Sequence, residues 1–270
     1  MITLSIRRLV DPYYNGFAAQ VAFYFLMSIV PTVIVLSQLL GFFSISLSAL
    51  DDLINQYVAK DAADILLRLL RHQSTGAMNF FFIALALWAS SRAEFSLMRI
   101  ANYTMSGGET TGNGYFRDRI RACKTMALTL FTLTFGLIIL VYGEIIIKIV
   151  AAALLTTLKI NLEVSVFWLV LRWPVTLLLY FFMVSYSYYI LPSVKVTFRQ
   201  VLPGSLFSSV GMLAVTLIYK YYAEYMAQMD LIYGSLAAIV AVMFWFYLLA
   251  WALVLGIMCN KVWEDTRGVE

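Results

Sequence analysis

One uninterrupted apolar run spans residues 231–259, LIYGSLAAIVAVMFWFYLLAWALVLGIMC, and it contains no Asp, Glu, Lys, Arg or His. A helix needs about 20 such residues to cross the roughly 30 Å hydrocarbon core of a bilayer. Of the 270 residues, 62% are hydrophobic and 13% are charged, whereas soluble domains carry about 25% charged residues. This composition excludes an ordinary soluble enzyme and a disordered chain, and it predicts an integral membrane protein.

Five further apolar runs precede this one in the sequence. Only helices and closed barrels satisfy their own backbone hydrogen bonds inside a bilayer, and barrels show short alternating strands instead of long apolar runs. We therefore predict an all-α polytopic membrane protein with six transmembrane helices in a single domain. The predicted spans are residues 18–40, 77–91 (the shortest), 125–147, 168–191, 201–219 and 231–259. Residues 92–105 are expected to continue the second helix into the cytoplasm.

Basic residues are distributed unevenly over the connections and termini. The two termini, the 2–3 connection and the 4–5 connection carry about twice as many Lys and Arg residues as the other connections. Because basic residues are enriched on the cytoplasmic side, both termini are predicted to be cytoplasmic. Six basic residues fall in the 2–3 connection: Arg92, Arg99, Arg117, Arg119, Arg121 and Lys124. They suit membrane lipids with anionic headgroups, so the net charge of +4 does not indicate a nucleic acid partner.

The 1–2 connection carries a helical pattern of its own. Ser48 followed by Asp51 is typical of a capping box. Apolar residues then recur three or four positions apart, at Ile54, Val58, Ala62, Ile65 and Leu69. We predict an amphipathic helix on the outer side, which either packs on the bundle and membrane or forms a lid or docking surface.

Three ionisable residues lie near the outer ends of the third and fourth predicted helices. Glu144 and Lys148 are four positions apart, a spacing that pairs them on one helix face. Arg172 precedes Trp173 and Pro174 at the start of the next helix. These three residues form a candidate site for an anionic headgroup, and the alternative is a solvated helix end.

The first predicted helix is interrupted by Ser28 and Pro31. Proline removes a backbone hydrogen bond and frees a carbonyl near Met27. Such breaks line cavities in transporters. The alternative is a purely structural kink, which would show the same sequence pattern. A transport path would be lined by Tyr24, Ser28, Asn102 and Glu144, whereas a protein without transport activity would have a dry core. Close helix approach is expected at Gly204, Gly211, Gly234 and Gly256.

Residues that support metal or nucleophilic catalysis are scarce. The one histidine, His72, lies in the outer 1–2 connection, and no cluster of His and carboxylates has the spacing of a metal site. We therefore expect no catalytic residues, no metal and no cofactor. A ribonuclease is not expected.

Several short segments, in order, resemble the YihY/BrkB family of bacterial inner-membrane proteins. They are Ala18–Pro31, Leu87–Ser91, Arg99–Asn102, Leu191–Pro192, Pro203–Gly204, Tyr233–Ala238, Trp245–Tyr247 and Gly256–Asn260. The resemblance implies a six-helix protein of the inner membrane. Members have been labelled virulence-associated factors, transporters and, formerly, a tRNA-processing ribonuclease. Members often carry Glu two residues before the final Asn, and this chain has Met258 there.

Two functions are consistent with these features. The first is a transporter or flippase-like protein for an amphiphilic or anionic envelope molecule. The alternative is a membrane scaffold that binds lipid or an envelope partner protein without transport. The sequence leaves self-association into a homo-oligomer open.

Overall fold

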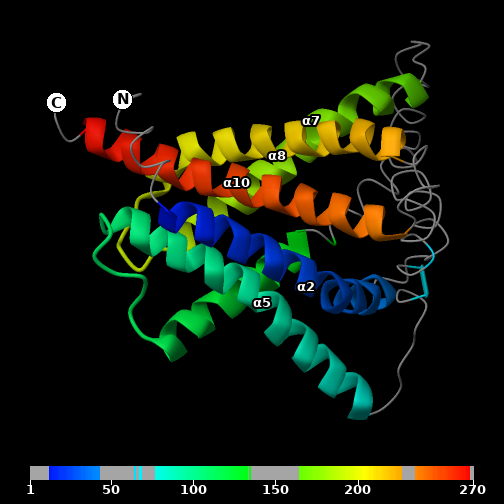
Figure 1. Cartoon of the computed structure of the whole chain (residues 1–270), viewed down its shortest axis with the longest axis horizontal. Helices are drawn as coiled ribbons and strands as arrows, with labels where there is room; N and C mark the ends of the chain where they lie inside the picture. Colours follow the sequence, from blue (N-terminus) through cyan, green and yellow to red (C-terminus); the bar gives the residue numbers. More distant parts are fainter. Residues whose placement is uncertain are drawn as a thin grey trace, which may run out of the picture.

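The computed structural model describes residues 12–42, 64, 67–68, 77–132, 134, 164–226 and 235–267, and each secondary-structure element within them is a helix. The labelled helices are α2 (Pro12–Phe42), α5 (Ala77–Met105), α7 (Val164–Ile190), α8 (Phe198–Met226) and α10 (Ser235–Arg267). Residues 115–132 form a further helix, here called the 115–132 helix. In Figure 1 these helices form an elongated bundle, with the start of α2 and the end of α10 toward the same end.

Each labelled helix contains most or all of one predicted span. α2, α8 and α10 extend beyond the apolar runs, and α5 continues fourteen residues past the predicted end of the second span. Three segments are long and apolar enough to cross a membrane among the residues described: Trp173–Ile190, Phe198–Tyr219 and Val240–Thr266. Most of the third predicted span and of the outer amphipathic helix lies outside the described residues.

α2 and α5 pack against each other in antiparallel directions along much of their length. Tyr14 Oη lies 3.1 Å from Thr104 Oγ1 near one end, and Thr32 Oγ1 lies 3.1 Å from Ser90 Oγ farther along. Residues 92–105 continue the second helix, as predicted from the sequence. This part of α5 lies beside the N-terminal half of α2, and Leu97, Met98 and Ala101 are buried there. Its predicted cytoplasmic location stays a prediction.

α8 and α10 approach closely because glycines lie at their crossing. A Cβ on Gly204 would come within 2.5 Å of the Asn260 side chain, and a Cβ on Gly211 would lie 3.3 Å from the Ala252 Cβ. Gly256 faces the same crossing from α10. The predicted close packing is confirmed at these three glycines, whereas Gly234 lies outside the described residues.

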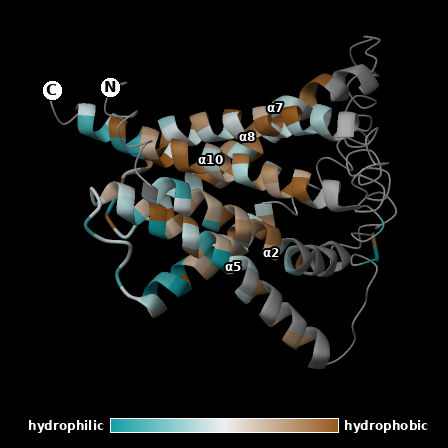
Figure 2. Cartoon of the chain, in the orientation of Figure 1, coloured by the Kyte–Doolittle hydropathy of each residue, from teal (hydrophilic) through white to brown (hydrophobic). Residues whose placement is uncertain are grey.

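Polar contacts hold α7 to this crossing. Tyr188 Oη on α7 lies 2.7 Å from Ser208 Oγ on α8. Each hydroxyl also reaches a carbonyl of α10: Tyr188 donates to Leu253 O at 2.5 Å and Ser208 donates to Ala252 O at 2.9 Å. Figure 2 shows hydrophobic residues along α7, α8 and α10, and hydrophilic residues at the C-terminal end of α10 and at the start of the 115–132 helix.

Candidate functional site

A buried carboxyl group lies in the middle of α5. Glu94 is buried, and its Oε1 accepts a 3.0 Å hydrogen bond from Thr129 Oγ1 on the 115–132 helix. Its Oε2 is also buried and has no hydrogen-bond partner among the described residues. Ser90, Ser91 and Ser96 on the same helix are buried as well. This segment of α5 therefore brings several polar side chains into the interior of the helix bundle.

Several other buried hydroxyl groups are satisfied within their own helices. Thr125 donates to Arg121 O at 3.0 Å, Ser205 donates to Val201 O at 2.6 Å, and Ser209 donates to Ser205 O at 2.7 Å. Such bonds let a hydroxyl group lie in an apolar core at little cost. Glu94 has no equivalent arrangement, because a carboxylate has two oxygens that both need donors.

Two arginines converge on one tryptophan beside this segment. The Arg92 guanidinium carbon lies 4.4 Å from the centroid of the Trp88 ring, and that of Arg119 lies 5.3 Å from it. Arg119 Nη2 also donates a 2.6 Å hydrogen bond to Trp88 O. Tyr24 on α2 completes the group, with its ring centroid 5.8 Å from the Arg92 guanidinium carbon. We call Tyr24, Trp88, Arg92 and Arg119 the arginine–tryptophan cluster.

Neither arginine of this cluster has a carboxylate partner in the described part of the chain. The ion pairs found there join Lys261 to Glu264 and Asp265, both at 3.1 Å. Arg119 Nε is buried and has no hydrogen-bond partner among the described residues. The cluster therefore holds two positive charges without a described counter-charge.

Asn102 ties together the loops at the end of α5. Its Oδ1 accepts a 2.6 Å hydrogen bond from Ser193 N, and its Nδ2 donates to Thr111 O at 3.1 Å. Arg121 Nη1 reinforces the same connection by donating to Pro192 O at 3.0 Å. Asn102 is eight residues beyond Glu94, about 12 Å along the helix. Its two hydrogen bonds join the connections after α5 and after α7, and its predicted place on a transport path stays a prediction.

The remaining predicted site residues divide into two groups. Tyr24, Ser28 and Pro31 are half-buried or buried on α2, and Ser28 Oγ donates to Phe25 O at 2.8 Å. Glu144 and Lys148 lie outside the described residues, and for Arg172 only the backbone within α7 is described. The outer charged cluster therefore stays a prediction.

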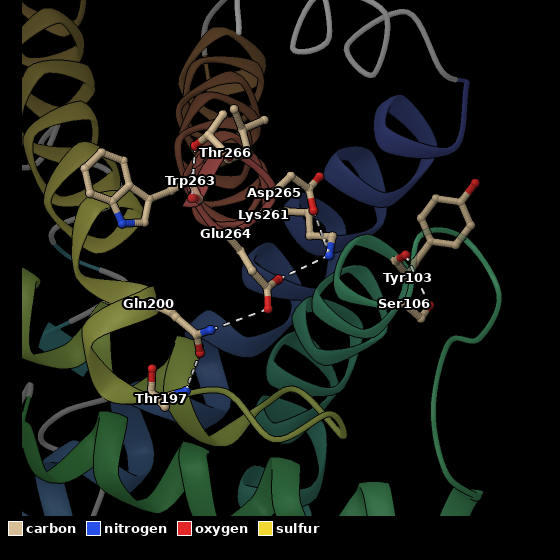
Figure 3. A network of polar contacts seen from close by, with 10 residues as sticks. Tyr103, Ser106, Thr197, Gln200, Lys261, Trp263, Glu264, Asp265 and Thr266 are labelled. Atoms are coloured by element: carbon tan, nitrogen blue, oxygen red, sulfur yellow. Dashed lines mark hydrogen bonds and ion pairs between the residues drawn. The ribbon is translucent and has the colours of Figure 1, made fainter. Parts of the chain in front are cut away.

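A polar network joins the start of α8 to the end of α10. Gln200 Oε1 accepts a hydrogen bond from Thr197 N at 2.6 Å, and its Nε2 lies 3.5 Å from Glu264 Oε1. Figure 3 shows Lys261 reaching both Glu264 and Asp265 beside it. These residues satisfy one another at a helix end, so we assign them a structural role.

Within the described residues, no group of three or more His, Cys, Asp or Glu side chains has the geometry to hold a metal ion. The ionisable side chains with a buried, unpartnered polar atom in the described segments are Glu94, Asp118 and Arg119, and Arg119 belongs to the arginine–tryptophan cluster.

The fold and these sites define a helical, polytopic membrane protein. Residues 5–270 match the family model described as Virulence factor BrkB, and the chain therefore belongs to this family, as its sequence motifs suggested. The chain is also 27% identical over 243 residues to the ribonuclease-like protein YfkH of Bacillus subtilis (strain 168). The aligned region covers 88% of this chain and 86% of YfkH. No solved structure matches the chain.

Proposed function

We propose that this BrkB-family membrane protein is a transporter or flippase-like protein for an amphiphilic or anionic envelope molecule of the bacterial inner membrane. The observation that carries this proposal is the buried Glu94 carboxyl group, whose Oε2 has no hydrogen-bond partner among the described residues. The carboxyl group lies on the stretch of α5 that packs beside α2.

An ionisable residue inside a membrane bundle needs a functional or structural reason. Its insertion costs about 2.5–3.5 kcal/mol, and such residues mark substrate pathways and proton relays. A structural role would require that both carboxyl oxygens be satisfied, as a buried polar group otherwise costs about 1–3 kcal/mol. The open Oε2 of Glu94 therefore favours a role in which the group exchanges partners during a transport cycle.

The alternative is a scaffold that binds lipid or an envelope protein without moving anything. A scaffold gains nothing from an unsatisfied buried acid, because a glutamine or leucine would pack α5 at lower cost. The buried serines of α5 point in the same direction, since Ser96 Oγ also has no hydrogen-bond partner among the described residues. The polar interior of this half of the bundle therefore supports transport over scaffolding.

The test is lipid movement in proteoliposomes that contain purified protein. Fluorescent phosphatidylglycerol in the inner leaflet is followed by its accessibility to an external quencher, for the wild type, Glu94→Gln and Glu109→Gln. The last variant is the control, because Glu109 is an exposed carboxyl group in the loop after α5. We expect faster lipid movement with the wild type than without protein, at least a tenfold loss in Glu94→Gln, and no change in Glu109→Gln.

Two results would contradict this proposal. Wild-type vesicles that move neither phosphatidylglycerol nor a zwitterionic lipid faster than protein-free vesicles would support the scaffold. Equal rates of lipid movement for Glu94→Gln and the wild type would show that the Glu94 carboxyl group is not part of the transport path. Glutamine retains an oxygen that can accept from Thr129, so the variant is expected to fold.

A further inference from the structure

We infer that the arginine–tryptophan cluster is a lateral binding site for a phosphate-bearing anion of the kind found in an anionic lipid headgroup. The inference rests on the proposed function, because it names the substrate class that such a protein would take. It is carried by different residues, so the two proposals fail in different experiments.

The first argument is the number of free donors in the cluster. An arginine guanidinium has five N–H donors in a planar fork that matches phosphate geometry. In Arg119 one Nη2 bond goes to Trp88 O, and Arg92 makes no hydrogen bond among the described residues, so the remaining Nη donors of the two side chains are available to an anion. Both guanidiniums are already held over the same indole ring. The cluster is thus preorganised for an anion.

The second argument is the missing counter-charge. Arg92 and Arg119 belong to the 2–3 connection, where the second predicted apolar run ends, and both side chains are partly exposed. An arginine beside apolar side chains stays charged and is stabilised when its head reaches water or a counter-ion. No described carboxylate forms an ion pair with Arg92 or Arg119. A phosphate group of a lipid that enters from the side would supply the missing counter-charge.

The third argument is the apolar surface beside the cluster. Trp88 is 47% exposed, and its sequence neighbour Leu87 is also exposed. On α2, Phe23 packs its ring 5.6 Å from that of Tyr24 and is itself exposed, as is Met27 one turn farther on. Acyl chains can lie against these side chains while the headgroup contacts the arginines. The site therefore fits an amphiphile with a phosphate head better than a small hydrophilic anion.

A purely structural cation–π contact is the competing explanation. It would contribute about 0.5–2 kcal/mol to stability and would bind no ligand. Neutral variants would then lower the melting temperature without changing lipid binding. The two explanations are separated by measuring binding and stability on the same samples.

Binding is measured by native mass spectrometry of the detergent-solubilised full chain titrated with phosphatidylglycerol or with phosphatidylcholine. The variants are Arg92→Gln, Arg119→Gln and the double variant. Arg117→Gln is the matched control, because Arg117 is exposed on the same helix as Arg119 and has the same charge. We expect the double variant to bind phosphatidylglycerol at least tenfold more weakly, the control to bind within twofold of the wild type, and phosphatidylcholine to show a smaller difference.

Inorganic phosphate distinguishes the two sources of the anion. Displacement of phosphatidylglycerol by phosphate would assign recognition to the phosphate group alone, whereas retention of the lipid would show that the acyl chains contribute. Equal phosphatidylglycerol binding by the double variant and Arg117→Gln would overturn the site. If the double variant does not fold, Arg92→Gln decides in the same way, because Arg92 makes no hydrogen bond that would be lost among the described residues.

Failure of this inference is distinct from failure of the proposed function. If the arginine variants bind phosphatidylglycerol as the wild type does and still move lipid, the binding site is refuted and the transporter proposal stands. If binding depends on the arginines but the wild type moves no lipid, the binding site stands and the protein is a scaffold.

Discussion

Substitution of Gly256 by alanine tests the packing of the α8–α10 crossing most directly. A Cβ at this position would overlap Ser208 Oγ and would lie 2.6 Å from Gly204 O and 2.8 Å from Tyr188 Oη. Two of these neighbours are the hydroxyl groups that join α7 and α8 to the carbonyls of α10. The added methyl group therefore forces the helices apart where their polar contacts lie.

The expected cost follows from three contributions. Overpacking a core costs about 1–3 kcal/mol, and each of two lost hydrogen bonds adds about 1 kcal/mol. The higher helix propensity of alanine offsets about 1 kcal/mol. We expect a net loss of about 3 kcal/mol for Gly256→Ala, which corresponds to a melting temperature lower by roughly 6–12 °C.

The control is Gly16→Ala on α2, where a Cβ would have no atom within 4 Å. This variant should be unchanged or stabilised by up to about 1 kcal/mol. The measurement is thermal unfolding of both purified variants and the wild type in one detergent, followed by size-exclusion chromatography. A Gly256→Ala protein that melts together with Gly16→Ala would refute the packing described at this crossing.

Two further predictions concern topology and enzymatic activity. The topology test uses a background in which Cys123 and Cys259 are replaced by serine. Single cysteines introduced at Gln56 and at Glu109 should then be labelled from opposite sides of the membrane in intact cells. Labelling of both positions from the same side would contradict the six-helix topology. The purified chain should cleave no RNA with any divalent metal, and cleavage abolished by substitutions in the chain would reverse this expectation.

Apolar runs predicted the helices well because hydrophobicity along one segment is a local property. The run at 231–259 lies almost wholly within α10, and Val201–Tyr219 lies within α8. Small residues likewise predicted close helix packing, since a glycine without a side chain is useful chiefly where backbones approach. The first inference needs only the sequence of one helix, and the second needs only the small residues of two neighbouring helices.

The polar segment of α5 could not be placed in the same way. The predicted second span ends at residue 91, just before Arg92 and Glu94, and the sequence alone showed no partner for these charges. The structure packs this segment beside α2, and Glu94 accepts a hydrogen bond from Thr129, thirty-five positions later in the chain. One available signal was overlooked: Ala93, Leu97 and Ile100 recur at helical spacing and continue an apolar stripe past Ser91.

The two halves of the described bundle differ in how their buried polar groups are satisfied. Around α7, α8 and α10, the buried groups without partners are neutral: Ser185 Oγ, Trp245 Nε1 and Asn260 Nδ2. On α5 and the 115–132 helix they include the charged side chains Glu94, Asp118 and Arg119. Close packing at glycines makes the first half resistant to rearrangement, because any shift breaks several contacts together. Charged groups with open hydrogen-bonding positions make the second half the place where a ligand can change the balance of contacts. If the chain transports as proposed, we therefore expect the contacts of α5 and the 115–132 helix to change first, because the buried charged groups with open positions lie there.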